Sequence, residues 1–210
     1  MATTTTTAPS IPELEQQYVL QNYARYPLVI TSGKGVAVYD DQRRRYLDFL
    51  SGIGVNALGH AHPRIVKVVR EQVGKLVHCS NLYYNEYQGP LAAKLSEISG
   101  LQRTFFCNSG AEAMEGALKI ARAHGTRQSA DKYEIVALEN SFHGRTFGAL
   151  SITGQAKYRH DFEPLVPGAR FVDVNNFDQL EQAVSDRTCA IVLEPIQGEG
   201  GIVAVACEFA

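Results

Sequence analysis

The sequence predicts an α/β protein built around a largely parallel sheet. Apolar runs of strand length alternate with amphipathic stretches of helix length through the second half of the chain. Polar and glycine-rich segments follow three of these runs, as expected for loops at the carboxyl ends of parallel strands. A chain of 210 residues can bury a sizeable core.

The composition is that of a soluble globular protein, with 45% hydrophobic and 20% charged residues. A net charge of −2 indicates neither nucleic acid nor an anionic membrane as a partner. The four scattered cysteines favour reduced thiols in a cytoplasmic protein over a disulfide framework. His60 and His62 lack an acidic or cysteine partner nearby, so no metal site is predicted. No apolar segment is long enough to span a bilayer.

The first hundred residues predict a tail, a strand-rich segment and two helices. Residues 1–10 are threonine-rich and predict a disordered tail, and residues 11–26 predict a short helix or arm. The apolar, glycine-rich stretch 51–59 predicts a loop that lines a site. Strands joined by tight turns are expected over residues 28–31, 36–39 and 45–50. Amphipathic helices are expected from Pro63 to Leu76 and from Leu91 to a stop at Gly100.

The second half predicts further strands alternating with helices. A strand over residues 104–107 leads into a helix that begins at Ser109, because Ser109 and Glu112 form a capping-box pattern, and Gly125 is its expected stop. Asn176 is the expected N-cap of another helix. These further elements are strands over 134–138, 149–152, 171–174 and 189–193, and a helix over 177–184.

The junction at residues 108–111 carries a chemical signal. A strand that delivers Ser109, Gly110 and Ala111 to a helix N-terminus presents unpaired N–H groups and a partial positive charge at one point, which predicts a phosphate site. The alternative is an ordinary capped helix, and this stretch alone leaves both open. The segment is neither a P-loop nor a dinucleotide fingerprint, since the glycines and lysine of those motifs are absent.

Two further loops are expected at the same sheet edge. Phe142 can lie flat on a planar ring, and Arg145 can bind a carboxylate through two parallel hydrogen bonds. Glu194 and Glu199 add two carboxylates. Each residue has a structural alternative: Phe142 in the core, Arg145 in a surface ion pair, Glu194 at a strand end. Their common location favours one functional site.

The motifs, in their order along the chain, resemble the class III family of pyridoxal-phosphate-dependent aminotransferases. The likeness runs from about Leu14 to the end of the chain and departs from the family at Met114 and Gly116. Within the family, Asn56–His60 and Ser80–Tyr84 favour the branch that acts on N2-acetylornithine. The motifs that carry the resemblance are Tyr46–Phe49, Gly54–Pro63, Ser80–Tyr84, Phe106–Ala113, Glu139–Thr146, Phe162–Gly168 and Leu193–Gly201.

The resemblance implies a fold and a set of site residues. The implied fold is the pyridoxal-phosphate-dependent transferase fold (fold type I), incomplete here: a tail over 1–10, a small-domain segment over 11–62, and the front half of the large cofactor-binding domain over 63–210. The implied cofactor is pyridoxal 5'-phosphate. The roles it assigns are phosphate binding by Gly110 and Ala111 with help from Ser109, ring stacking by Phe142, α-carboxylate binding by Arg145, a place near the substrate's carboxylate or amine for Glu199, and a supporting polar role for Glu194.

The resemblance also implies an activity and partners. The δ-amino group of N2-acetylornithine would pass to 2-oxoglutarate, giving glutamate, as a step of arginine biosynthesis in a cytoplasmic homodimer. The family's Schiff-base lysine and its pyridine-pairing aspartate are expected beyond Ala210, so this chain alone is expected to be an inactive fragment. The alternatives are an ornithine, succinylornithine or 4-aminobutyrate transaminase, or a non-catalytic relative that binds a phosphate ligand or a full-length paralogue.

Overall fold

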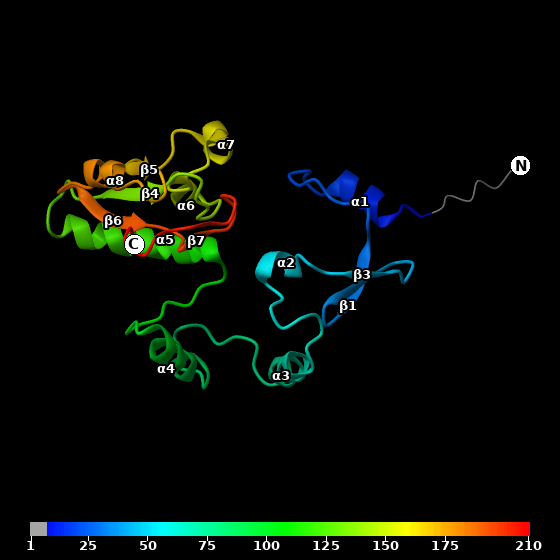
Figure 1. The fold of residues 1–210 in the computed structure, drawn as a ribbon. Helices are drawn as coiled ribbons and strands as arrows, with labels where there is room; N and C mark the ends of the chain where they lie inside the picture. The colour runs from blue at the N-terminus through cyan, green and yellow to red at the C-terminus, as the bar shows by residue number, and fades with distance from the viewer. Residues whose placement is uncertain (1–7) are drawn as a thin grey trace, which may run out of the picture. The chain divides into compact units, whose positions relative to one another are not determined.

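The computed structural model describes residues 8–210, which form two compact units divided after Asn85 (Figure 1). Residues 1–7 of the expected tail lie outside the described residues. Ser10, which was also assigned to the tail, is the N-cap of the first helix. The expected domain boundary at residues 62 and 63 concerns the complete family fold and stays a prediction.

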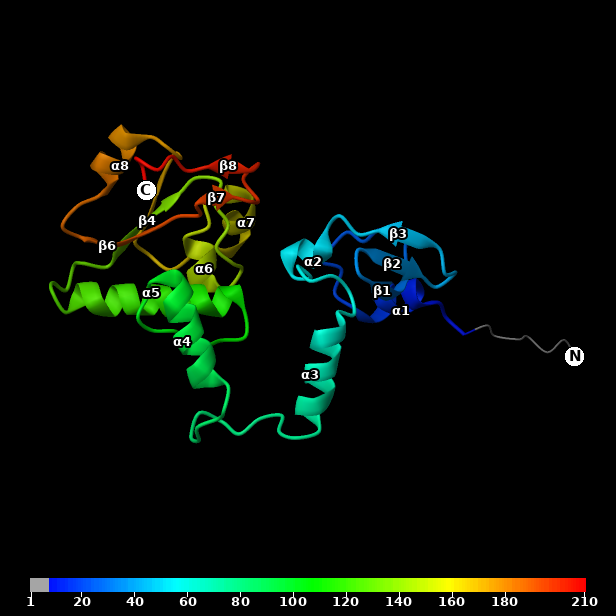
Figure 2. The same ribbon diagram turned by 60° about the horizontal axis from the view of Figure 1, so that its bottom comes forward.

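The first unit contains a three-stranded antiparallel sheet of order β1-β2-β3 (Figure 2). The three strands and two helices expected in this region are confirmed, with their ends shifted by a few residues. The predicted loop over 51–59 is also confirmed as irregular, since Gly52 and Ile53 inside the short helix α2 have positive φ. The elements are α1 (Ile11–Tyr18), β1 (Ile30–Lys34), β2 (Ala37–Asp40), β3 (Arg45–Leu47), α2 (Ser51–Gly54) and α3 (Pro63–Val73).

A buried carboxylate closes the turn between β2 and β3. Asp40 is 1% exposed, and its side chain accepts hydrogen bonds from the backbone N–H of Gln42, from Arg44 and from the Tyr46 hydroxyl. Burial raises the pKa of Asp40, but the bonds from Arg44 and Tyr46 outweigh it and hold this pKa below its usual value. The turn is therefore fixed by an ionised side chain with its acceptors filled.

A second carboxylate ties the end of β3 to the loop after α2. Asp48 Oδ2 lies 2.7 Å from His60 Nε2, and its Oδ1 accepts hydrogen bonds from the backbone N–H groups of Leu50 and Ser51. A Cβ on Gly33 would lie 2.6 Å from Cγ of the His60 ring, so only glycine lets β1 pack this closely. His60 is thus held by a carboxylate, and residues 8–210 contain no cluster of side chains suited to hold a metal ion.

The Asp48–His60 contact predicts that acid destabilises the first unit. The hydrogen bond from His60, followed by that from the Ser51 N–H, lowers the pKa of Asp48 below its unfolded value of about 3.9. The stabilisation is therefore complete above about pH 4 and is lost as pH falls through the lower folded pKa. Asp48→Asn should flatten the acid limb of a thermal-melting profile against pH. The exposed neighbour Asp41→Asn is the control, and equal flattening in both variants would contradict the assignment.

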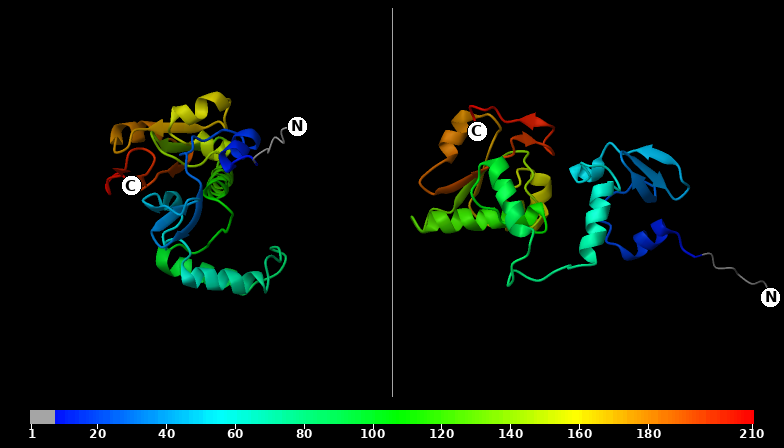
Figure 3. Two further views of the ribbon diagram at one scale, coloured as in Figure 1. Left: turned by 90° about the vertical axis from the view of Figure 1, so that its right-hand side faces the viewer. Right: turned by 90° about the horizontal axis from the view of Figure 1, so that it is seen from below.

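The second unit is built on a parallel sheet of order β5-β4-β6 (Figure 3). The chain reaches it through a helix that ends at Gly100, whose φ of 73° is the left-handed helix stop predicted from the sequence. The elements are α4 (Gln88–Ser99), α5 (Gly110–Thr126), β4 (Glu134–Leu138), α6 (Phe147–Ser151), α7 (Ala156–Arg159) with a 3-10 turn (His160–Phe162), β5 (Ala169–Val172), α8 (Phe177–Ala183), β6 (Thr188–Val192), β7 (Ile196–Gln197) and β8 (Val203–Ala204).

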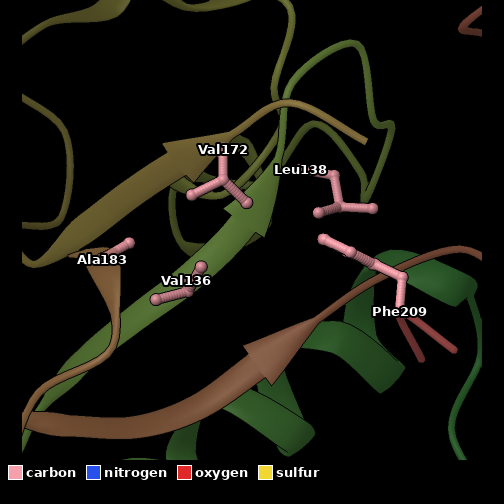
Figure 4. Close-up of a cluster of buried hydrophobic side chains, with 5 residues drawn as sticks. All are labelled: Val136, Leu138, Val172, Ala183 and Phe209. Carbon is pink, nitrogen blue, oxygen red and sulfur yellow. The ribbon is translucent and has the colours of Figure 1, made fainter. Parts of the chain in front are cut away.

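The central strand β4 is buried throughout, and its side chains alternate between two cores. One core lies on the α8 face and consists of Val136, Leu138, Val172, Ala183 and Phe209 (Figure 4). The other lies on the α5 face and consists of Leu118, Ile135, Ala137 and Ile152. A parallel sheet covered on both faces brings the carboxyl ends of its strands to one edge, which confirms the α/β class predicted from the sequence.

Three local predictions in this unit are wrong. Residues 104–107 are not a strand, because no other strand of the described chain pairs with them. Residues 149–152 are not a strand either: α6 ends at Ser151, whose hydroxyl donates to the Phe147 carbonyl. Gly125 does not stop α5, which continues to Thr126. A Cβ on Gly125 would lie 2.2 Å from the Lys132 carbonyl oxygen, so close packing explains this glycine.

No helix within residues 8–210 has the length and apolar character needed to cross a membrane.

Candidate functional site

The N-terminus of α5 is capped in a way that leaves two N–H groups without a partner. Ser109 Oγ accepts a hydrogen bond from the Glu112 N–H, as the capping-box pattern predicts. The Glu112 carboxylate accepts instead from the backbone and side chain of Asn108. Among residues 8–210, the N–H groups of Gly110 and Ala111 have no hydrogen-bond partner. They lie at the positive end of a 17-residue helix, which is suited to bind an anion.

The loop after β4 packs against this helix end through Gly144. Its φ is 130°, and a Cβ there would lie 2.9 Å from the Ala149 Cβ and 3.1 Å from the Ala111 Cβ. Any other residue would push the loop away from the first turn of α5. Gly144 therefore places the segment that carries Phe142 and Arg145 beside the unpaired N–H groups.

A buried polar network holds the same loop from behind. Thr153 Oγ1 accepts a hydrogen bond from the His143 N–H at 3.1 Å, and Ser141 Oγ accepts one from the Gly154 N–H at 3.0 Å. Gln155 Nε2 donates to the carbonyl of Ser141. These residues were not predicted from the sequence. The available signal was the pair of polar residues Thr153 and Gln155 directly after an apolar stretch, which is compatible with a buried polar network.

The third predicted loop joins the other two through Glu194. Its Oε2 accepts a hydrogen bond from the Phe142 N–H at 3.0 Å. Three residues later, buried Gln197 donates from Nε2 to the Glu139 carbonyl at 2.8 Å. The loops that begin at Asn108, Asn140 and Glu194 therefore meet at one edge of the sheet. Gln197 was not predicted, and its place within a glycine-rich motif offered no sign that it is buried.

Phe142 and Arg145 both contact Tyr158, a residue that was not predicted from the sequence. The rings of Phe142 and Tyr158 meet edge to face, with centroids 6.1 Å apart. The guanidinium carbon of Arg145 lies 5.2 Å from the centroid of the same Tyr158 ring. A cation over an aromatic face is attracted by the ring quadrupole. Tyr158 thus links the planar aromatic side chain to the cation, although nothing in its spacing marked it.

His143 places a neutral imidazole inside the site. It is 8% exposed, and its Nε2 is buried without a hydrogen-bond partner among residues 8–210. Burial lowers the pKa of His143, and the nearby Glu194 carboxylate opposes the shift only in part. The ring is therefore neutral at pH 7, and its Nε2 atom is enclosed by protein.

Glu199 is the one candidate that the structure does not join to the others. It lies exposed on the turn between β7 and β8, and it forms no hydrogen bond or ion pair within residues 8–210.

Met114 and Gly116, the two departures from the family pattern, leave the N-terminus of α5 intact. Met114 packs against the core of the α5 face, and a Cβ on Gly116 would lie 3.0 Å from the Phe105 ring.

These residues fit a ligand that carries a phosphate and a flat aromatic ring. The unpaired N–H groups of Gly110 and Ala111 suit the phosphate. The half-buried ring of Phe142 suits a flat ring beside the phosphate. Arg145 on Tyr158 adds a cation for a carboxylate.

Comparison with known proteins matches this chain to transaminases. A family model described as "Aminotransferase class-III" matches residues 18–210. An acetylornithine aminotransferase of Caldanaerobacter subterraneus subsp. tengcongensis is 48% identical over 196 residues, covering 93% of this chain and 50% of that relative. An acetylornithine aminotransferase of Methanocaldococcus jannaschii is 50% identical over 191 residues, covering 90% and 48%. The chain spans about half the length of the curated relatives that it matches.

A solved structure supports the same comparison. The ornithine aminotransferase of Toxoplasma gondii, crystallised with oxidised glutathione and partly occupied by pyridoxal phosphate at its active site, matches with a TM-score of 0.85. The two sequences are 36% identical, and the match covers 93% of this chain and 47% of that one.

Proposed function

This chain belongs to the class III aminotransferases, and from that premise we propose that it forms part of a pyridoxal-phosphate-dependent enzyme that transfers the δ-amino group of N2-acetylornithine to 2-oxoglutarate. The observation that carries the proposal is the pair of unpaired N–H groups at Gly110 and Ala111 beside Phe142 and Arg145. The substrate choice is supported by the names of the curated relatives.

The proposed cofactor site uses the end of α5 and the ring of Phe142. Gly110 and Ala111 donate their N–H groups to the phosphate. Ser109 Oγ already accepts a bond from the Glu112 N–H, so its own hydroxyl hydrogen is directed to the same phosphate. Phe142 stacks on the pyridine ring, held in place because its N–H donates to Glu194. When bound, pyridoxal phosphate supplies the electron sink for transamination.

The proposed substrate site uses Arg145 and the glutamates. Arg145, oriented by the face of Tyr158, binds the α-carboxylate that amino donor and oxo-acid acceptor share. Glu199 lies near the far end of the substrate, and Glu194 supports the cofactor ring through the Phe142 N–H. A lysine that bonds to the cofactor and an aspartate that pairs with its pyridine nitrogen are to be supplied from outside the motifs of this chain.

We also propose that the enzyme is a cytoplasmic homodimer. Several large apolar side chains of the first unit are almost fully exposed, among them Phe49 at 91%, Leu82 at 85% and Tyr84 at 105%. An apolar surface of this kind is suited to pack against further protein, which is either the remaining half of the enzyme or a second subunit. A second subunit is the partner that the family resemblance implies.

Two fusion proteins test the proposed activity. This chain is joined to the non-matching half of the Methanocaldococcus acetylornithine aminotransferase in one fusion and of the Toxoplasma ornithine aminotransferase in the other. The donors are N2-acetylornithine, ornithine, N2-succinylornithine and 4-aminobutyrate, with 2-oxoglutarate as acceptor. We expect N2-acetylornithine to have the highest kcat/KM in both fusions, by about tenfold, because residues of this chain bind the donor. The chain alone is the control and should show no turnover.

Three other outcomes of the fusion experiment would contradict the proposal, each in a different way. A donor preference that changes with the added half would overturn the assignment of donor choice to this chain. Folded but inactive fusions would favour the non-catalytic alternative, a relative that binds a phosphate ligand or a full-length paralogue. A preference for ornithine in both fusions would favour the ornithine branch, which the Toxoplasma structure represents.

A further inference from the structure

Glu115 connects two parts of the candidate site without belonging to either. It lies on the second turn of α5 and is half-buried, and its carboxylate reaches away from its own helix to α6. Oε1 accepts a hydrogen bond from the Thr146 hydroxyl and another from the Ala149 N–H, at 3.1 Å from the Ala149 nitrogen. Thr146 occupies the N-cap position of α6, yet its side chain forms no cap bond. The Glu115 carboxylate therefore acts as the cap of α6.

The sequence leaves room for this carboxylate at Gly148. A Cβ there would lie 2.2 Å from Glu115 Oε2 and 2.7 Å from its carboxyl carbon. Those separations are far below van der Waals contact, so any side chain at 148 would displace the carboxylate. Gly148 has no positive φ, and its absent side chain is explained by this contact.

The two elements that Glu115 joins carry the two ends of the proposed ligand site. Gly110, at the phosphate end, precedes Glu115 by five residues of continuous helix, or about 7.5 Å along its axis. Arg145, at the carboxylate end, directly precedes Thr146. We propose that Glu115 is a positioning residue that sets the distance between the phosphate-binding end of α5 and Arg145. This inference rests on the proposed function.

A purely stabilising role for Glu115 predicts a different result from a positioning role. Loss of stability lowers the folded fraction, which weakens the apparent binding of every ligand by the same factor. Loss of positioning leaves each end of the site intact but changes the distance between them. Only a ligand that occupies both ends is then bound more weakly.

The test compares two ligands on the 210-residue chain by calorimetry. Pyridoxamine 5'-phosphate occupies the phosphate end alone, and the stable reduced adduct N-(5'-phosphopyridoxyl)-L-glutamate occupies both ends. We expect Glu115→Ala to weaken binding of the adduct by about 10- to 100-fold and binding of pyridoxamine 5'-phosphate by less than about twofold, because misplacement of about 1 Å has effects of this size. Gly148→Ala should act in the same direction. Glu115→Gln should stay near wild type, because its amide oxygen can accept both bonds.

Amide hydrogen exchange gives a readout that does not depend on ligands. The Ala149 N–H should lose protection in Glu115→Ala and keep it in Glu115→Gln, while the buried β4 amides stay protected in both. Equal weakening of both ligands by Glu115→Ala would overturn the positioning role and leave the proposed function standing. Failure of both the wild-type chain and the corresponding fusion proteins to bind either ligand would overturn the proposed function and, with it, this inference. An unchanged Ala149 amide would overturn the capping contact itself.

Discussion

Replacing Arg145 with leucine is expected to lower kcat/KM for 2-oxoglutarate by about 10²- to 10⁴-fold in the active fusion protein. The reason is the loss of a two-pronged, charge-assisted hydrogen bond to the substrate carboxylate, in which each bond contributes about 1.5–3 kcal/mol. Arg145→Lys should keep the charge but lose the paired geometry. Its kcat/KM should fall between those of the parent and of Arg145→Leu. Steady-state kinetics with both substrates measure the effect.

The control for this prediction removes a different cation, one that lies outside the candidate site. Arg127 is the C-cap residue of α5, so Arg127→Leu should leave kcat/KM near the value of the parent. Binding of pyridoxamine 5'-phosphate should be unchanged in Arg145→Leu, because the phosphate end does not use Arg145. An Arg145→Leu enzyme with parental kcat/KM would show that this cation does not bind substrate.

Replacing Gly110 with proline is expected to weaken binding of pyridoxamine 5'-phosphate by about 10- to 100-fold, which corresponds to one hydrogen bond to a charged group. Proline removes the N–H donor and leaves the fold unstrained. It is favoured at the first position of a helix, and Ser109 before it already has the extended conformation that a following proline requires, with φ of −153° and ψ of 162°. Calorimetry on the 210-residue chain measures the affinity.

Gly110→Ala is the matched variant, because it changes the side chain and keeps the N–H group. No atom lies within 4 Å of a Cβ built on Gly110, so alanine should bind the ligand as the wild type does. Pyridoxamine without its phosphate should bind wild type and Gly110→Pro equally weakly. Equal affinity of Gly110→Pro and Gly110→Ala for the phosphate ligand would exclude the Gly110 N–H as a phosphate donor.

Tyr158 and Glu115 were not predicted because each contacts the candidate site from a distant part of the sequence. Tyr158 lies 13 residues beyond Arg145 and reaches it through space. Glu115 lies 31 residues before Thr146, whose hydroxyl donates a hydrogen bond to the Glu115 carboxylate. Contacts between residues so far apart leave no periodic signal, and a single tyrosine or glutamate in a mixed stretch is read as surface or core.

Local chemistry alone determined much of this protein. The apolar run of β4, the capping pattern at Ser109, the N-cap at Asn176 and the left-handed stop at Gly100 each depend on neighbouring residues, so they were readable from the sequence. The family motifs added the candidate site, because short motifs keep residues together at fixed spacing.

Only the tertiary structure decided features that depend on distant partners. Residues 104–107 have strand composition but no strand to pair with, and a strand needs a neighbour for its N–H and C=O groups. Residues 149–152 predict a strand from their composition, but residues 147–151 form α6, whose first turn is capped by the distant Glu115 carboxylate. The meeting of Phe142, Arg145 and Glu194 likewise required the parallel sheet that brings their loops to one edge.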